Sequence, residues 1–170
     1  MAQSRPRILL VNPPIHDFSA YDFWLKPFGL LRVAGQLRGR ADLRLFDSLD
    51  RSSLRDAGHA ALRSDAFGRG EFPSEVVEKP PIFARILRRY RRFGTPRSSF
   101  QDFLAREGPF DFALVQTVMT YWYPGVREVI EDLRALAPRT KIALGGVYVT
   151  ICPAHARSLG ADLVIEGLDL

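Results

Sequence analysis

The sequence predicts an α/β fold: a Rossmann-like, flavodoxin-like three-layer sandwich built on a five-stranded parallel sheet, with a helical insertion. Two observations lead to this prediction. Short continuous apolar runs, typical of strands buried on both faces, alternate with segments whose apolar residues recur at helical spacing. Strands and helices that alternate in this way form right-handed crossovers, which make the strands parallel. At 170 residues the chain is long enough for one core, so we expect a single domain over 1–170.

The first expected unit of the sheet lies near the N-terminus. Residues 7–11 (RILLV) form an apolar run between Pro6 and the Asn-Pro-Pro sequence at 12–14, which predicts a buried strand. Apolar residues at helical spacing, followed by Gly39 at the position of a C-terminal cap, predict a helix over 27–38. The next strand is expected at 42–46 (DLRLF).

The second run of units begins after residue 110 and supplies the other three strands. Pro124 opens its first helix, whose apolar residues lie on one face, and Gly160 ends its second helix. The expected elements are a strand over 111–117, a helix over 124–136, a strand over 141–146, a short helix over 153–159 and a last strand over 162–167.

The chain between these two runs is much longer than a crossover needs. We therefore expect an insertion at about 48–110 with two or three helices of its own, one of which carries the arginine-rich stretch RILRRYRRFGTPR. From Lys79 to Gln101 there is no acidic residue. An alternative function is therefore a nucleic-acid-binding or protein-interaction module acting through the basic segment 85–97. Nucleic acid is the less favoured partner of the two, because such stretches are more often solvated faces or interfaces to acidic domains.

Composition excludes several classes of protein. Cys152 is the only cysteine, so the chain forms no internal disulfide and no CxxC zinc site, and it cannot hold an iron–sulfur cluster alone. No GxGxxG follows the first strand, which argues against a dinucleotide, and the lack of a GxxxxGK[ST] motif rules out a P-loop. No apolar run reaches the roughly 18–20 residues that cross a bilayer, and the N-terminus lacks a secretory signal. We therefore expect a cytoplasmic protein with no membrane partner.

Three loops are expected at one edge of the sheet. In a parallel sheet of this kind a ligand binds beyond the carboxyl ends of the strands, where the strand order reverses. The loops there combine short polar groups with Pro or Gly and many aromatic residues, which predicts a pocket. Gly145 and Gly146 either shape a turn or clear space for a flat ligand against the backbone. The expected hydrogen-bonding groups of the pocket are Asn12, Thr117, Thr120 and Thr150.

Four stretches carry a resemblance to a known family by their order and spacing: ILLVNPP, YDFWLKPFGLLRVAGQL, MTYWYPG and LGGVYVTICPAHA. Together they resemble the N-terminal cobalamin (B12)-binding-type domain of the cobalamin-dependent radical S-adenosylmethionine (SAM) proteins, over essentially the whole chain. In that family the domain precedes a radical SAM barrel whose CxxxCxxC motif holds a 4Fe-4S cluster. The motif is absent here. The resemblance therefore implies a radical SAM catalytic domain in cis beyond residue 170, with the 4Fe-4S cluster and SAM in that domain and no catalysis by this chain alone.

The resemblance also implies where cobalamin would lie, and the domain would either present cobalamin to the barrel or only cap it. The mutase-type DxHxxG motif, whose histidine coordinates cobalt, is incomplete around His16, so no metal ligand is assigned. The aromatic residues Tyr121, Trp122, Tyr123 and Tyr148 either face the ligand or fill the cavity. The residues implied to line the cofactor cavity are Asn12, Pro13, Pro14, Thr117, Met119, Thr120, Gly145, Gly146, Val147, Tyr148 and Thr150.

Overall fold

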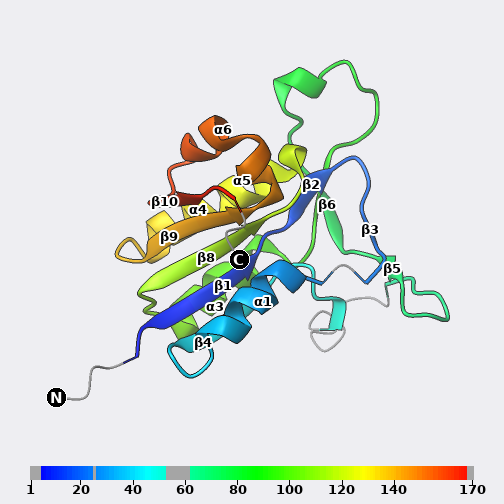
Figure 1. Ribbon diagram of the computed structural model, residues 1–170. Helices are drawn as coiled ribbons and strands as arrows, with labels where there is room; N and C mark the ends of the chain where they lie inside the picture. The colour runs from blue at the N-terminus through cyan, green and yellow to red at the C-terminus, as the bar shows by residue number, and fades with distance from the viewer. Residues whose placement is uncertain (1–4, 25, 53–61, 168–170) are drawn as a thin grey trace.

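The computed structural model describes residues 5–24, 26–52 and 62–167, which form an α/β sandwich around a five-stranded parallel sheet (Figure 1). The spatial order of the strands, β4-β1-β8-β9-β10, is the flavodoxin-like order. This finding confirms the fold class that the sequence predicted. The strands are β1 (Arg7–Asn12), β4 (Asp42–Asp47), β8 (Phe112–Thr117), β9 (Lys141–Gly146) and β10 (Leu163–Ile165).

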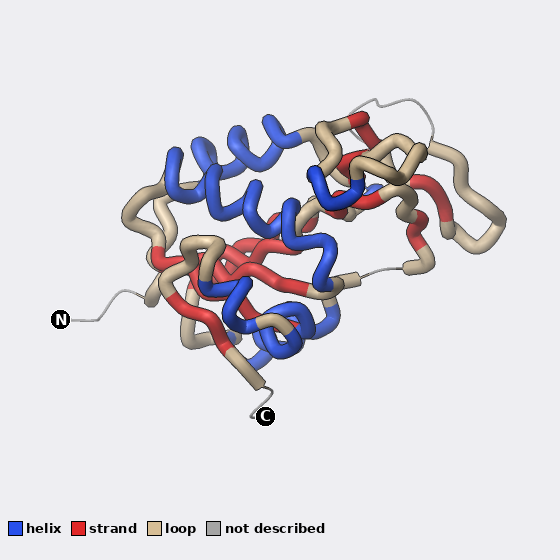
Figure 2. Tube along the Cα trace, turned by 90° about the horizontal axis from the view of Figure 1, so that it is seen from above, coloured by secondary structure: helices blue, strands red, loops and turns tan. Residues whose placement is uncertain are grey.

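Helices cover the sheet unequally on its two faces. Alternate strand residues, such as Leu9 and Val11, point to one face and pack in a single core with residues of four helices. On the opposite face α1 (Phe28–Leu37) contacts β1 and β8. Figure 2 shows the strands edge-on, with helices on both sides. The four helices of the first face are α3 (Arg97–Glu107), α4 (Tyr123–Leu136), α5 (Val147–Ile151) and α6 (Pro153–Arg157).

The strand order reverses between β1 and β8. In the register of the sheet, Leu10 of β1 lies opposite Leu45 of β4 on one side and opposite Leu114 of β8 on the other. The chain passes from β1 to β4, and then returns across β1 to begin β8. The loops after β1 and β8 therefore diverge at the carboxyl edge, which leaves a crevice there.

The prediction of a helical insertion is wrong for most of its described residues. Between 62 and 96 the chain forms short strands and one 3₁₀ helix. Among the described residues of the insertion, only α3 is an α-helix of ordinary length; residues 53–61 lie outside the described part. The reason is pairing with the loop after β1, which contributes two strands of its own. The arrangement is β2 (Ile15–Asp17), β7 (Arg91–Phe93) and β6 (Ser74–Val76) in one antiparallel sheet, β3 (Tyr21–Asp22) with β5 (Gly70–Glu71) in another, and the 3₁₀ helix η1 (Pro81–Phe83).

Candidate functional site

A pocket opens at the carboxyl edge of the sheet, at the point where the strand order reverses. Its volume is about 620 Å³, within the range of roughly 300–1,000 Å³ that is usual for small-molecule sites. Its floor is formed by the ends of β1, β8 and β9, one wall by the first turns of α1, and the other by α5. The three loops that the sequence placed at one edge of the sheet therefore do meet there.

Most of the residues expected at the cofactor cavity lie around this pocket. Thr120, which begins the 3₁₀ helix η2 (Thr120–Trp122), and Tyr148 are the two that do not line it. The expected residues that line it are Asn12, Pro13, Pro14, Thr117, Met119, Gly145, Gly146, Val147 and Thr150.

Tyr148 lies outside the pocket because the chain after β9 is helical. The expectation was a loop over 147–152, but Val147 already begins α5. In a helix, residues separated by three and four positions share a face. Accordingly Val147, Thr150 and Ile151 line the pocket, whereas Tyr148 is buried in the core on the opposite side, where its hydroxyl lies 2.5 Å from His155 Nδ1. Burial raises the pKa of the Tyr148 hydroxyl to about 12, so Tyr148 stays neutral at ordinary pH.

The two adjacent glycines have different roles. Gly146 has φ +121°, and a Cβ there would lie 2.2 Å from the carbonyl oxygen of Thr117, so this position requires glycine to form the turn. Gly145 has no such backbone constraint, and a Cβ built on it would meet no atom within 4 Å. Because Gly145 lines the pocket, its missing side chain leaves the floor open. Gly146 therefore forms the turn, and Gly145 keeps the pocket floor free of a side chain.

The polar side chains at the pocket floor bind one another. Asn12 Nδ2 donates to Asp47 Oδ1 at 2.7 Å, and Asn12 Oδ1 accepts a hydrogen bond from Gln116 Nε2 at 3.3 Å. Gln116 Oε1 in turn accepts from the backbone N–H of Leu30, which fixes the start of α1 on the sheet. Burial raises the pKa of Asp47, and the hydrogen bonds from Asn12 and the Leu49 amide oppose this effect.

The threonines at the pocket are also engaged within the chain. Thr117 Oγ1 donates to the carbonyl oxygen of Gly145 at 3.1 Å, and Thr150 Oγ1 donates to that of Gly146 at 3.2 Å. Since the polar groups are satisfied internally, the pocket presents mainly apolar surface. A ligand here would be held by shape and apolar contact more than by hydrogen bonds.

The aromatic residues of the loop after β8 do not fill the pocket. Trp122 lines one side, where its indole N–H donates to Asp17 Oδ2 at 2.9 Å. Tyr123 packs against the main core, and Tyr121 is exposed. Among the described residues, the aromatic side chains that line the pocket are Trp122 and Phe28, at the start of α1.

Sequence reasoning missed the wall that α1 contributes. Gly29 and Leu30 line the pocket together with Phe28 and Val33. Leu30 is the one buried residue of α1, while Phe28, Leu31 and Val33 are exposed although they are apolar. A helix that is apolar on several faces and covers only part of a sheet leaves apolar surface uncovered. The apolar composition of residues 28–33 could therefore have indicated that α1 lines the pocket.

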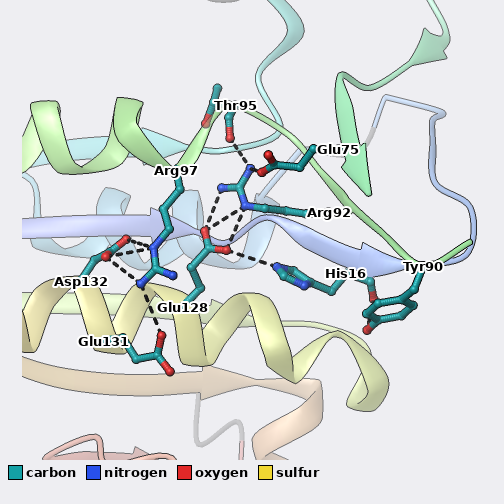
Figure 3. Close-up of polar contacts among 9 residues, drawn as sticks. All are labelled: His16, Glu75, Tyr90, Arg92, Thr95, Arg97, Glu128, Glu131 and Asp132. Carbon is teal, nitrogen blue, oxygen red and sulfur yellow. Dashed lines mark hydrogen bonds and ion pairs between the residues drawn. The ribbon is translucent and has the colours of Figure 1, made fainter. Parts of the chain in front are cut away.

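The basic segment 85–97 is not helical before Arg97, which begins α3, and its arginines differ in burial. Figure 3 shows Arg92 of β7 and Arg97 of α3 pointing toward the carboxylates of α4. Arg92 Nη2 donates to Glu128 Oε1 at 2.8 Å, and Arg97 Nη2 donates to Asp132 Oδ1 at 2.8 Å. These two arginines attach the insertion to α4 through ion pairs.

Glu128 is the centre of this ion-pair cluster. Its carboxylate accepts hydrogen bonds from Arg92 Nε at 2.9 and 3.0 Å, and His16 Nε2 lies 3.3 Å from Glu128 Oε2. Burial alone would raise the pKa of Glu128, but hydrogen bonds from His16 and Arg92, together with the Arg92 charge, lower it to about 2. His16 therefore belongs to this cluster and does not line the pocket.

The described residues hold no group of three or more His, Cys, Asp and Glu side chains that could bind a metal ion. Within the same ranges, 5–24, 26–52 and 62–167, no helix is both long enough and apolar enough to pass through a membrane. Compared with known proteins, the chain matches no protein-family model, and it matches no curated protein significantly.

Proposed function

We propose that this chain is a cobalamin-binding-type accessory domain of a radical SAM enzyme, and that the pocket at the carboxyl edge receives the cofactor. The observation that carries the proposal is the open position at Gly145, where a Cβ would meet no atom within 4 Å, on the floor of a 620 Å³ apolar pocket. A planar macrocycle that lies on strand ends needs backbone without Cβ atoms beneath it. The ordered sequence stretches that resemble the family support the same reading.

The residues present fit part of such a cofactor. The walls from α1 and α5 offer apolar contacts through Phe28, Val33 and Val147, and Gly145 leaves the floor flat. His16 is engaged with Glu128, so this chain supplies no histidine to cobalt from that position. When bound, cobalamin would supply cobalt–carbon bond chemistry. The role of the described residues would be to bind and orient the cofactor and to exclude water from its buried side.

The test is retention of hydroxocobalamin by residues 1–170 during gel filtration, followed by visible absorbance. We expect the corrin absorbance to travel with the protein. The variant Gly145→Leu, which fills the floor without a backbone clash, should lose most of this absorbance, while Gly35→Leu, on an exposed part of α1 with no atom within 4 Å of its Cβ, should keep it. If the wild-type chain retains no corrin, its cofactor role is rejected and capping of the catalytic barrel remains.

The alternative function, nucleic-acid binding through segment 85–97, finds less support in the described contacts. Arg92 and Arg97 are bound to α4, and Arg91 donates to Ser74 Oγ at 3.0 Å. The exposed arginines that remain are Arg85, Arg88 and Arg89. These three arginines lie in the loop that joins β6 to β7.

A further inference from the structure

The loop that joins β6 to β7, residues 77–90, presents aliphatic side chains to solvent. We call it the tip loop; it projects from the body at the top right of Figure 1, in green. Leu87 is 100% exposed and Ile82 is 83% exposed, and Ile86 is exposed as well. Large apolar side chains gathered at one exposed projection mark a surface that contacts something other than water.

Cations surround these aliphatic side chains. Arg85, Arg88 and Arg89 are exposed, and among the described residues they have no ion-pair partner within 4.0 Å. Lys79 is used inside the loop: its ammonium donates to the carbonyl oxygen of Ile86 and lies 5.8 Å from the centre of the Phe18 ring. The tip loop therefore combines three unpaired guanidinium groups with apolar side chains, and its one carboxylate belongs to Glu78, near the start of the loop.

The aromatic side chains of the tip loop pack against the body of the protein at the base of the loop. Phe83 and Tyr90 both pack on the Phe18 ring, with centroid distances of 5.6 and 5.3 Å. Tyr90 is also buried, and its hydroxyl donates to the carbonyl oxygen of His16 at 3.1 Å. Single-stranded nucleic acids bind largely by stacking bases on aromatic side chains, which this loop does not leave free. The aromatic base instead holds the aliphatic tip in place.

We propose that the tip loop binds the surface of an anionic lipid membrane. Leu87 and Ile82 would enter the boundary between head groups and acyl chains, while Arg85, Arg88 and Arg89 would contact lipid phosphates. Apolar burial combined with cations is what binds a peripheral protein to anionic lipid, and each cation contributes roughly fivefold in affinity. This contact is peripheral and does not require a spanning helix. It departs from the expectation of no membrane partner, and it does not depend on the proposed cobalamin function.

The test is co-sedimentation of residues 1–170 with vesicles of phosphatidylcholine, alone or with about one third phosphatidylglycerol. We expect sedimentation with the anionic vesicles only. The double variant Leu87→Ser/Arg88→Ala should bind these vesicles about tenfold more weakly. The matched variant Leu136→Ser/Arg139→Ala changes two exposed positions, at the end of α4 and in the loop that joins α4 to β9, and should bind like the wild type. In Figure 1 this loop lies at the opposite side of the molecule from the tip loop. Circular dichroism checks that both variants are folded.

Other results would overturn the proposal. Equal binding to both kinds of vesicle, no binding to either, or an equal loss in the matched variant would remove the tip loop as a membrane contact. The single variant Leu87→Ser decides the role of the aliphatic tip. If its binding to anionic vesicles is unchanged while a single-stranded oligonucleotide displaces the protein, the cations serve nucleic acid, and the membrane proposal fails.

Discussion

Replacing Glu128 by glutamine tests how the insertion is held on the sandwich. The substitution keeps the shape of the side chain and removes its charge, which leaves the Arg92 guanidinium buried beside a neutral amide. The side chains of Arg92 and Glu128 are only 5% and 10% exposed. Breaking one partner of a buried ion pair costs about 3–5 kcal/mol, and we expect the lower end because glutamine still accepts a hydrogen bond from Arg92.

The lowered pKa of Glu128 agrees with this order of magnitude. A fall from the usual 4.5 to about 2 in the folded protein corresponds to a stabilisation of about 3 kcal/mol. Because the folded-state pKa is depressed, this stabilisation is complete above pH 4.5 and is lost as the pH falls toward 2. The glutamine side chain of the Glu128→Gln variant does not titrate, so the variant should lack this component of the acid sensitivity.

Urea unfolding of the wild type and Glu128→Gln, followed by circular dichroism from neutral to acid pH, measures both effects. Glu131→Gln is the control, since Glu131 is 55% exposed on the same helix and pairs with Arg97 at the surface. It should change stability by less than about 1 kcal/mol. A loss below about 1 kcal/mol in Glu128→Gln, or a pH profile identical to that of the wild type, would refute the role assigned to the buried pair.

Four further substitutions test the geometry of the pocket and of the helix beside it. Gly146→Ala should destabilise the protein by about 2–4 kcal/mol in urea unfolding, because its Cβ would meet the Thr117 carbonyl oxygen, whereas Gly145→Ala should unfold like the wild type; equal effects would contradict the separate roles of the two glycines. Gly125→Ala should destabilise by about 1–3 kcal/mol in the same assay, because its Cβ would lie 1.9 Å from the Pro14 carbonyl oxygen, where α4 passes the turn after β1; unchanged stability would show that this approach is not tight. Asp47→Asn should not lower the stability at pH 7, because burial already disfavours the Asp47 carboxylate, and the wild type should approach the variant as the pH falls toward 3.8; a large loss at pH 7 would mean that the charge is required.

Much of the parallel sheet was predictable because its strands are local, continuous apolar runs. The strand predicted at 7–11 is observed over Arg7–Asn12, and that predicted at 141–146 is observed with the same bounds. Burial on both faces makes such strands apolar along their whole length, so each is recognisable without knowledge of its neighbours.

The insertion was not predictable in this way because its structure depends on distant pairing. Arg92 lies opposite His16 in the register of β2 and β7, and its side chain is neutralised by Glu128 on α4. Neither partner is near Arg92 in the sequence, so a run of arginines with interleaved aromatic residues resembled an exposed helix. A buried charge is stable only with its partner, and periodicity carries no information about that partner.

The candidate site was predictable from the sequence only in part. Its location followed from the rule for parallel sheets, since β1, β8 and β9 end at one edge. The orientation of individual side chains did not follow, because it depends on whether the chain after Gly146 is a loop or the helix α5. Tyr148 was placed at the pocket for this reason, and Ile151 was overlooked.

Hydrogen exchange measured by mass spectrometry, with and without hydroxocobalamin, tests the central proposal most directly. The proposal predicts slower amide exchange on cofactor addition in the segments that line the pocket: the Asn12 turn, the Met119 loop and the start of α5 at Val147. The tip loop, whose side chains do not line the pocket, should exchange at an unchanged rate. Slower exchange in the tip loop alone, or no change in any segment at saturating cofactor, would contradict a corrin site at this edge of the sheet.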